Sequence, residues 1–105
     1  VDFAEARRLL GLAGAQGDPE AARGLLGLAA AQGDAQAQYT LGGMHHEGQG
    51  GPADFAEARR LFGLAAAQGH TDAQWALAVM HHSGKGGPAD LVETRRLLGL
   101  AAAQG

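Results

Sequence analysis

Histidines stand in two adjacent pairs, His45-His46 and His81-His82, which lie 36 residues apart. Imidazole nitrogens can bind a metal or transfer a proton near neutral pH. Zinc in proteins usually takes four ligands, however, and Glu47 is the only acid close to these pairs. We therefore predict no metal site, and we keep zinc binding by His46 and His82 as an alternative.

Two glycine-rich segments, residues 48–51 and 84–87, invite comparison with phosphate-binding loops. Such a loop follows a strand and ends in Gly-Lys-Ser or Gly-Lys-Thr at a helix start. Here a helical sequence precedes the glycines, and Asp54 or Asp90 stands at the next helix start, where its charge would repel phosphate. We predict reversing loops in which the glycines adopt positive φ.

Catalytic chemistry has little support in this sequence. Ser83 is the only serine, cysteine is absent, and no Ser/His/Asp set or pair of acids has a plausible geometry. We therefore predict that the protein is not an enzyme and that it uses no cofactor.

Arginines recur along the chain, and about half of them have a glutamate three residues earlier, an arrangement that favours an ion pair on a helix. These pairs are Glu5/Arg8, Glu20/Arg23, Glu57/Arg60 and Glu93/Arg96. Arg7, Arg59 and Arg95 lack such a partner and are predicted to recur along one edge. Arg59 and Arg95 are candidates to meet an acidic segment of a partner, and a solvated face is the simpler interpretation.

Composition and charge exclude several classes of protein. The 105 residues suffice for one domain, and their net charge of −3 disfavours binding to nucleic acid, which needs a basic face. The absence of cysteine excludes a disulfide framework. The chain contains no long apolar run and no signal peptide, so we predict no membrane contact and favour the cytoplasm.

An internal repeat organises the whole sequence. The string Ala-Ala-Ala-Gln-Gly ends at Gly33, Gly69 and Gly105, each 36 residues after the last. The string Gly-Gly-Pro-Ala-Asp recurs at residues 50–54 and 86–90, with the same offset. Together with the histidine pairs, these markers indicate a repeat protein.

Each unit is predicted to form two helices, which we call the first and second helix of the unit. Asp54 followed by Glu57 forms a capping box, a pattern typical of a helix start. His70 stands where other helices have an aspartate, with Thr71 or Asp72 expected as substitute caps. The predicted helices cover residues 3–16, 19–32, 35–47, 54–68, 71–83 and 90–104.

These helices predict one all-α domain, an α-solenoid of about six helices in three stacked antiparallel pairs. Residues 34–69 and 70–105 are full repeats, whereas residues 1–33 form an irregular pair of second-helix type, which leaves open how helix 19–32 docks. Small residues are expected to let neighbouring helices approach closely, namely Gly11, Gly27, Gly42, Gly63, Ala78 and Gly99.

Residues 34–105 resemble the Sel-like repeat (the Sel-one family), a relative of the tetratricopeptide repeat. The first full repeat carries the family pattern at Ala37, Leu41-Gly42, Gly48, Gly50, Asp54, Ala58, Ala65-Ala66 and Gly69. His45 and His81 replace an aromatic residue of the pattern, so we interpret them as rings packed inside each hairpin. The resemblance implies a solenoid that binds other proteins as a scaffold or adaptor.

A possible partner surface follows from the first helices. Tyr39, Gly43 and His46 share a face, and Trp75, Val79 and His82 repeat it one unit later. Aromatic residues often anchor interfaces, although these rings could instead pack on the adjacent unit. We predict that a peptide or partner domain binds the concave face through residues drawn from Tyr39, His46, Arg59, Trp75, Val79, His82 and Arg95.

The alternative is a structural building block that forms homo-oligomers. Leu12, Leu28, Leu64 and Leu100 recur on successive second helices, where they could contact another copy of the chain. A chain that buries the leucines and its open ends against itself would change mass with concentration.

Overall fold

The computed structural model describes residues 17–104, which form five α-helices and no strand. The helices are α2 (Pro19–Ala31), α3 (Ala35–Glu47), α4 (Phe55–Ala67), α5 (Thr71–Ser83) and α6 (Leu91–Gln104). The ends of each helix agree with the prediction to within one residue. The helix predicted at 3–16 lies outside the described residues, and so do the predictions that fall on it, which concern Arg7, the Glu5/Arg8 pair, Gly11 and Leu12.

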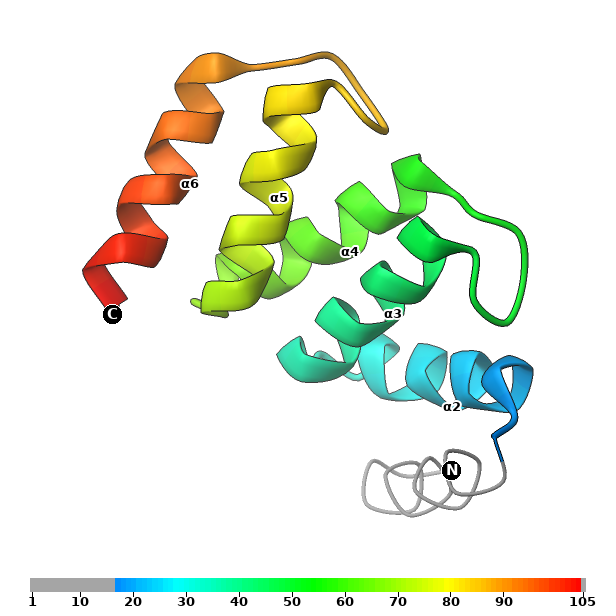
Figure 1. Ribbon diagram of the computed structural model, residues 1–105. Coiled ribbons are helices and arrows are strands. Elements are labelled where there is room, and N and C mark those ends of the chain that lie inside the picture. Colours follow the sequence, from blue (N-terminus) through cyan, green and yellow to red (C-terminus); the bar gives the residue numbers. More distant parts are fainter. Residues whose placement is uncertain (1–16, 105) are drawn as a thin grey trace.

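Each described helix packs against its neighbours in sequence, and the pairs α3–α4 and α5–α6 make the most extensive contacts. Figure 1 shows the helices following one another from α2 to α6, whose C-terminal end lies far from α2. Long loops join the helices within each pair, and short turns join one pair to the next. This arrangement confirms the predicted all-α solenoid.

Polar side chains begin the helices by accepting hydrogen bonds from otherwise unpaired backbone N–H groups. Three of these caps are the aspartates Asp18, Asp34 and Asp54. His70 is itself the cap of α5, because its Nδ1 accepts the N–H of Ala73 at 3.1 Å. The expectation that Thr71 or Asp72 would replace it is therefore wrong: an imidazole Nδ1 reaches the same position as an aspartate oxygen.

The core is built largely from alanine, leucine and methionine. One cluster joins α2, α3 and Leu61 of α4, and a second joins α4, α5 and Leu97 of α6. Gly42 allows a close approach, since a Cβ there would lie 2.8 Å from the ring of Phe62. The same expectation is wrong for three glycines, around which a Cβ would have open space: Gly27, Gly63 and Gly99.

The question of how α2 docks is answered by a repeated contact. The buried amide of Gln38 donates from Nε2 to the carbonyl of Ala30 at 3.2 Å. One repeat later, Gln74 donates in the same way to Ala66 at 3.3 Å. Helix α2 therefore packs on α3 as α4 packs on α5. It occupies the place of a second helix that stacks against the first helix of the next repeat.

Candidate protein-binding surface

The predicted strip of first-helix residues lines two adjacent clefts. The first has a volume of about 280 Å³ and lies between α3 and α5. Tyr39 and His46 form part of one wall and Val79 part of the other, and Phe62 of α4 also lines the cleft. Side chains of three helices therefore meet at this cleft.

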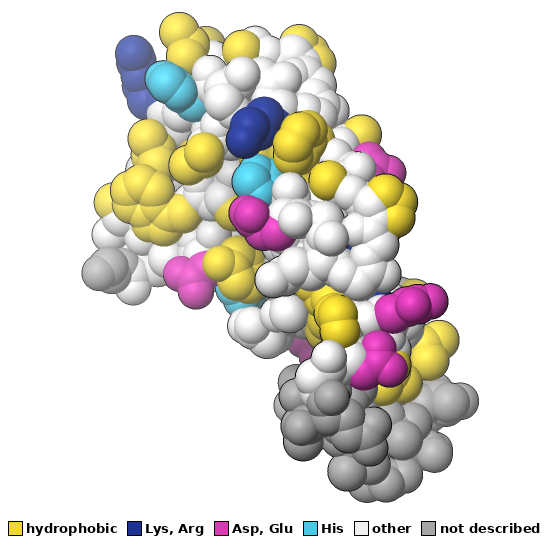
Figure 2. Space-filling view, turned by 45° about the vertical axis from the view of Figure 1, so that its right-hand side comes forward, with side chains coloured by type: hydrophobic (Ala, Val, Ile, Leu, Met, Phe, Trp, Pro, Cys, Tyr) yellow, Lys and Arg dark blue, Asp and Glu magenta, His cyan; other side chains and the backbone are white. Residues whose placement is uncertain are grey.

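The second cleft, of about 190 Å³, is the equivalent place one repeat later. It is lined by Trp75, Val79 and His82 of α5 and by Leu98 and Thr94 of α6. Trp75 is 49% exposed and Val79 is 60% exposed, although both are large hydrophobic side chains. Hydrophobic side chains also lie beside histidine and basic side chains on the face seen in Figure 2.

Tyr39 is less accessible than Trp75, because the next repeat covers part of its ring. The ring of His70 stacks on it with centroids 4.8 Å apart, and the ring of Phe62 lies at 5.8 Å. Tyr39 therefore packs on the adjacent unit, as one of the two interpretations expected, and it also lines the first cleft. Trp75 has the exposed position.

His46 contacts its own and the following helix. Its Nδ1 lies 2.8 Å from a carboxylate oxygen of Glu47, and its ring lies 5.3 Å from that of Phe55. Among residues 17–104, no three His, Cys, Asp or Glu side chains form a group that could hold a metal ion.

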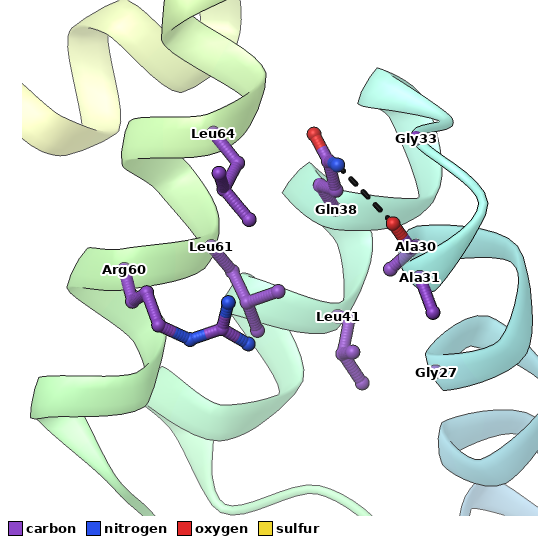
Figure 3. Close-up of a pocket in the computed structure, with 9 residues that line it drawn as sticks. All are labelled: Gly27, Ala30, Ala31, Gly33, Gln38, Leu41, Arg60, Leu61 and Leu64. Atoms are coloured by element: carbon purple, nitrogen blue, oxygen red, sulfur yellow. Dashed lines mark hydrogen bonds between the residues drawn. The ribbon is translucent and has the colours of Figure 1, made fainter.

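A second kind of cleft lies on the side of the second helices. Figure 3 shows the one between α2 and α4, where Leu64 and Arg60 of α4 face Ala30 and Ala31 of α2 across Gln38 of α3. Its volume is about 480 Å³, and a cleft of about 430 Å³ between α4 and α6 repeats it around Leu100. The exposed leucines were the only sequence signal for these clefts.

Arginine side chains connect the second helices α2 and α4 to the repeats that follow them. Arg23 of α2 brings Nη2 to 2.9 Å from Nδ1 of His45 and donates to the carbonyl of Pro52 at 3.1 Å. The predicted pairing of Glu20 with Arg23 is therefore wrong, since the guanidinium bonds to the following repeat instead.

Arg59 of α4 makes the same connection one repeat later. Its Nη2 contacts Nδ1 of His81 and donates to the carbonyl of Pro88 at 2.8 Å, while Nη1 donates to the carbonyl of Lys85 at 3.3 Å. Arg59 has no glutamate three residues earlier, and its partners lie in the next repeat instead. We call each set of arginine, histidine and proline carbonyl an inter-repeat joint.

The glycine loops that contribute the proline carbonyls of the joints also contact the starts of the second helices. Gly50 and Gly86 have φ of 75° and 76°, which confirms the predicted positive φ. A Cβ on Gly50 would lie 2.5 Å from the carbonyl oxygen of Pro19, and one on Gly86 would meet the carbonyl of Phe55. Each loop therefore rests directly on the start of the preceding second helix.

The joints favour uncharged histidine. Burial lowers the pKa of His45, and the positive charge of Arg23 lowers it further. Burial and Arg59 lower the pKa of His81 in the same way. A neutral imidazole can accept the arginine N–H at Nδ1, whereas a protonated ring has no lone pair left to accept it.

Arg95 of α6 occupies the position of Arg23 and Arg59, counted by the repeat. Its side chain is exposed, and it makes no hydrogen bond or ion pair with the rest of residues 17–104. Of the predicted site residues, five line the first-helix clefts, namely Tyr39, His46, Trp75, Val79 and His82. Arg59 lies in an inter-repeat joint, and Arg95 lies at the equivalent position of the next repeat.

Helix pairs stacked through a repeated contact define an α-solenoid repeat protein. The family model described as Sel1 repeat matches residues 4–34, 35–70 and 71–105, and the chain belongs to this family. Sel1 repeat proteins generally act in protein–protein interactions and are typically non-catalytic scaffolds. None of the helices within residues 17–104 has the length and hydropathy that a membrane span requires.

Solved structures with the same fold include two bacterial proteins. The crystal structure of c5321, a protective antigen of uropathogenic Escherichia coli strains with an SLR fold, is 35% identical with a TM-score of 0.87. That match covers 98% of this chain and 22% of the antigen. A Sel1 repeat protein from Oxalobacter formigenes is 36% identical with a TM-score of 0.81, covering 84% of this chain and 25% of that one.

This chain thus spans about a quarter or less of the length of these relatives. No match among curated proteins is found.

Proposed function

We propose that the chain is a protein-interaction module that receives a peptide or partner domain along its first-helix face. The observation that carries this proposal is the exposure of Trp75 and Val79, at 49% and 60%. Large apolar side chains in a concave site can bury much area against a partner, and tryptophan is enriched among residues that dominate binding energy.

The chemistry of the face favours a partner with apolar or aromatic side chains. Trp75 and Leu98 offer apolar surface in the second cleft, and Tyr39 and Phe62 offer aromatic surface in the first. His46 and His82 stand at equivalent places in the two clefts, where they can form hydrogen bonds with a bound backbone.

Arg59 contributes to this surface indirectly. Its hydrogen bonds to the loop that follows α5 hold α5 against α4, which fixes the wall of the first cleft. Arg95 remains available to an acidic group of a partner, since its side chain is exposed.

Ligands selected from a displayed library of random peptides provide the test. Affinity for the chain in solution is measured by titration calorimetry for the parent, for Trp75→Ala and for Leu28→Ala, a control on a second helix with a similar exposure of 44%. We expect Trp75→Ala to weaken binding by about tenfold or more and Leu28→Ala by less than about twofold. Ligands that bind both variants equally well would contradict the proposal.

Homotypic assembly is a second candidate, supported by the exposure of three equivalent leucines. Leu28, Leu64 and Leu100 are 44%, 42% and 41% exposed, so the second helices carry a repeated apolar surface. Light scattering over a concentration series tests it. A constant mass near 10.6 kDa rejects assembly, whereas a rising mass that Leu64→Ser abolishes supports it.

A further inference from the structure

We infer that α5 is a pH-responsive element, because two histidines hold it against the preceding repeat and make these contacts in their uncharged form. His70 stands at the start of α5 and His81 near its end, and each contacts a different helix of that repeat. Protonation of the two rings releases α5 from α3 and α4 and opens the first cleft. The inference concerns the position of α5 and does not depend on the proposed partner binding.

At the start of α5, the ring of His70 uses both of its nitrogens. Nδ1 accepts the N–H of Ala73 at 3.1 Å, so the neutral ring carries its proton on Nε2. This Nε2 donates to Oε1 of Gln36 on α3 at 2.9 Å, and the other end of the Gln36 amide donates to Thr40 at 3.2 Å. The same ring stacks on Tyr39 of α3. One neutral tautomer therefore both caps α5 and joins it to α3.

A proton on Nδ1 of His70 would break this arrangement. The charged ring has no lone pair, so it can no longer accept the N–H of Ala73. The start of a helix also carries a partial positive charge, which disfavours a cation there. Two acids stand near this place in the sequence: Asp72 in the first turn of α5, and Asp34, which accepts N–H groups of its own helix α3. The end of α4, residues 63–68, carries no charged side chain.

Near the end of α5, His81 makes the second contact with the preceding repeat. Its Nδ1 contacts Nη2 of Arg59 on α4, so a proton on this nitrogen would set two cations against each other. Burial and the charge of Arg59 lower the pKa of His81, as does Arg96 of α6, whereas Glu93 and Asp90 raise it. The end of a helix favours a cation. The pKa is nevertheless lowered, so the folded chain favours the neutral ring.

The first cleft lies between the helices that these two contacts join. Tyr39 forms part of its α3 wall and Val79 part of its α5 wall. Val79 stands between His70 and His81 along α5, so release at both ends moves this wall away and uncovers the ring of Tyr39. Buried apolar residues of α4 and α5 belong to one cluster, so we expect the helices to persist while the cleft widens.

The experiment follows Tyr39, the only tyrosine of the chain. Trp75→Phe removes the only tryptophan, so that tyrosine emission reports on Tyr39 alone. We expect acrylamide to quench this emission more strongly at about pH 5 than at about pH 7.5, by about 1.5-fold or more. The helical signal in circular dichroism should be the same at both pH values. Equal quenching would overturn the inference, and so would a rise that coincides with loss of the helical signal, because the whole chain would then unfold.

Variants in the Trp75→Phe background test the two histidines separately. Asparagine in His70→Asn can cap a helix and glutamine in His81→Gln can accept a hydrogen bond, but neither titrates. We expect each variant to reduce the acid-induced rise in quenching by about half or more. His81→Gln is the decisive variant, because it leaves the ring of His70 on Tyr39 in place. A rise that survives in full in either variant would refute the role of that histidine.

Two further histidine variants serve as matched controls. His46→Gln removes the other histidine of the first cleft, and His82→Gln removes an exposed histidine of α5. Both should keep the acid-induced rise in quenching. Loss of the rise in His46→Gln or His82→Gln would assign the effect to another side chain and would overturn the inference.

Discussion

Arg23 and His45 belong to different repeats, yet the guanidinium Nη2 lies 2.9 Å from the imidazole Nδ1 across 22 residues of sequence. Arg59 and His81 repeat this relationship at the same sequence separation. In each case the arginine also donates to a proline carbonyl in the loop that follows the histidine. The repeats are therefore connected by a polar contact in addition to their alanine-rich core.

Because the joint histidines His45 and His81 have lowered pKa values, we predict that the free energy of unfolding falls in mild acid. His45 and His81 have folded-state pKa values below the ordinary 6.5, so the unfolded chain takes up protons first as the pH falls. The contribution of each histidine is complete above about pH 6.5 and is lost as the pH falls through the folded-state pKa. Urea unfolding measured between about pH 7.5 and about pH 5 checks this window.

Two histidine variants identify the source of that dependence. His81→Gln keeps an acceptor but does not titrate, so we expect a weaker loss of stability across the same pH window. His82→Gln is the control, because His82 is exposed and lies outside the joint. An unchanged pH dependence in His81→Gln would show that the joint is not responsible.

Adjacent arginines on α4 should differ in their effect on stability. Arg59→Ala removes hydrogen bonds to the next repeat, and we expect it to lower the free energy of unfolding by about 1–3 kcal/mol. Arg60→Ala removes an exposed pair with Glu57 on the same helix and should cost less than about 0.5 kcal/mol. Urea denaturation measures both, and equal effects would contradict the joint.

Glycines in the loop and in the helix should respond in opposite directions to alanine. Gly86 has φ of 76°, and a Cβ there would meet the carbonyl of Phe55, so we expect Gly86→Ala to destabilise by about 1–3 kcal/mol. Gly63 lies inside α4 with open space around it, so Gly63→Ala should stabilise by about 0.5–1 kcal/mol. Thermal unfolding of both variants tests the prediction, and melting temperatures that shift in the same direction would refute it.

Gly42 and Phe62 should be energetically coupled. A Cβ on Gly42 would lie 2.8 Å from the Phe62 ring, so Gly42→Ala alone should destabilise by about 1–3 kcal/mol. The next repeat carries Ala78 and Leu98 at these positions. We therefore expect Gly42→Ala combined with Phe62→Leu to cost less than the sum of the single changes, and a double-mutant cycle by urea unfolding measures the difference. Strict additivity would mean that the two positions act independently.

The sequence alone determined the period, the helices and most of their ends. A helix forms from contacts three and four residues apart, and its caps are local, so Asp54 and the apolar spacing of α4 are enough to predict it. The positive φ at Gly50 and Gly86 was also predictable, because a short reversing loop needs a residue without a Cβ. The face shared by Trp75, Val79 and His82 followed from helical spacing.

What those faces and side chains contact depends on how the repeats stack. Sequence spacing paired Arg23 with Glu20, but its guanidinium bonds to His45 and Pro52, because stacking brings the next loop within reach. The same stacking buries part of Tyr39 beneath His70 and leaves Trp75 open. These contacts join residues many positions apart, so their existence depends on how the repeats pack, which no local pattern of the sequence specifies.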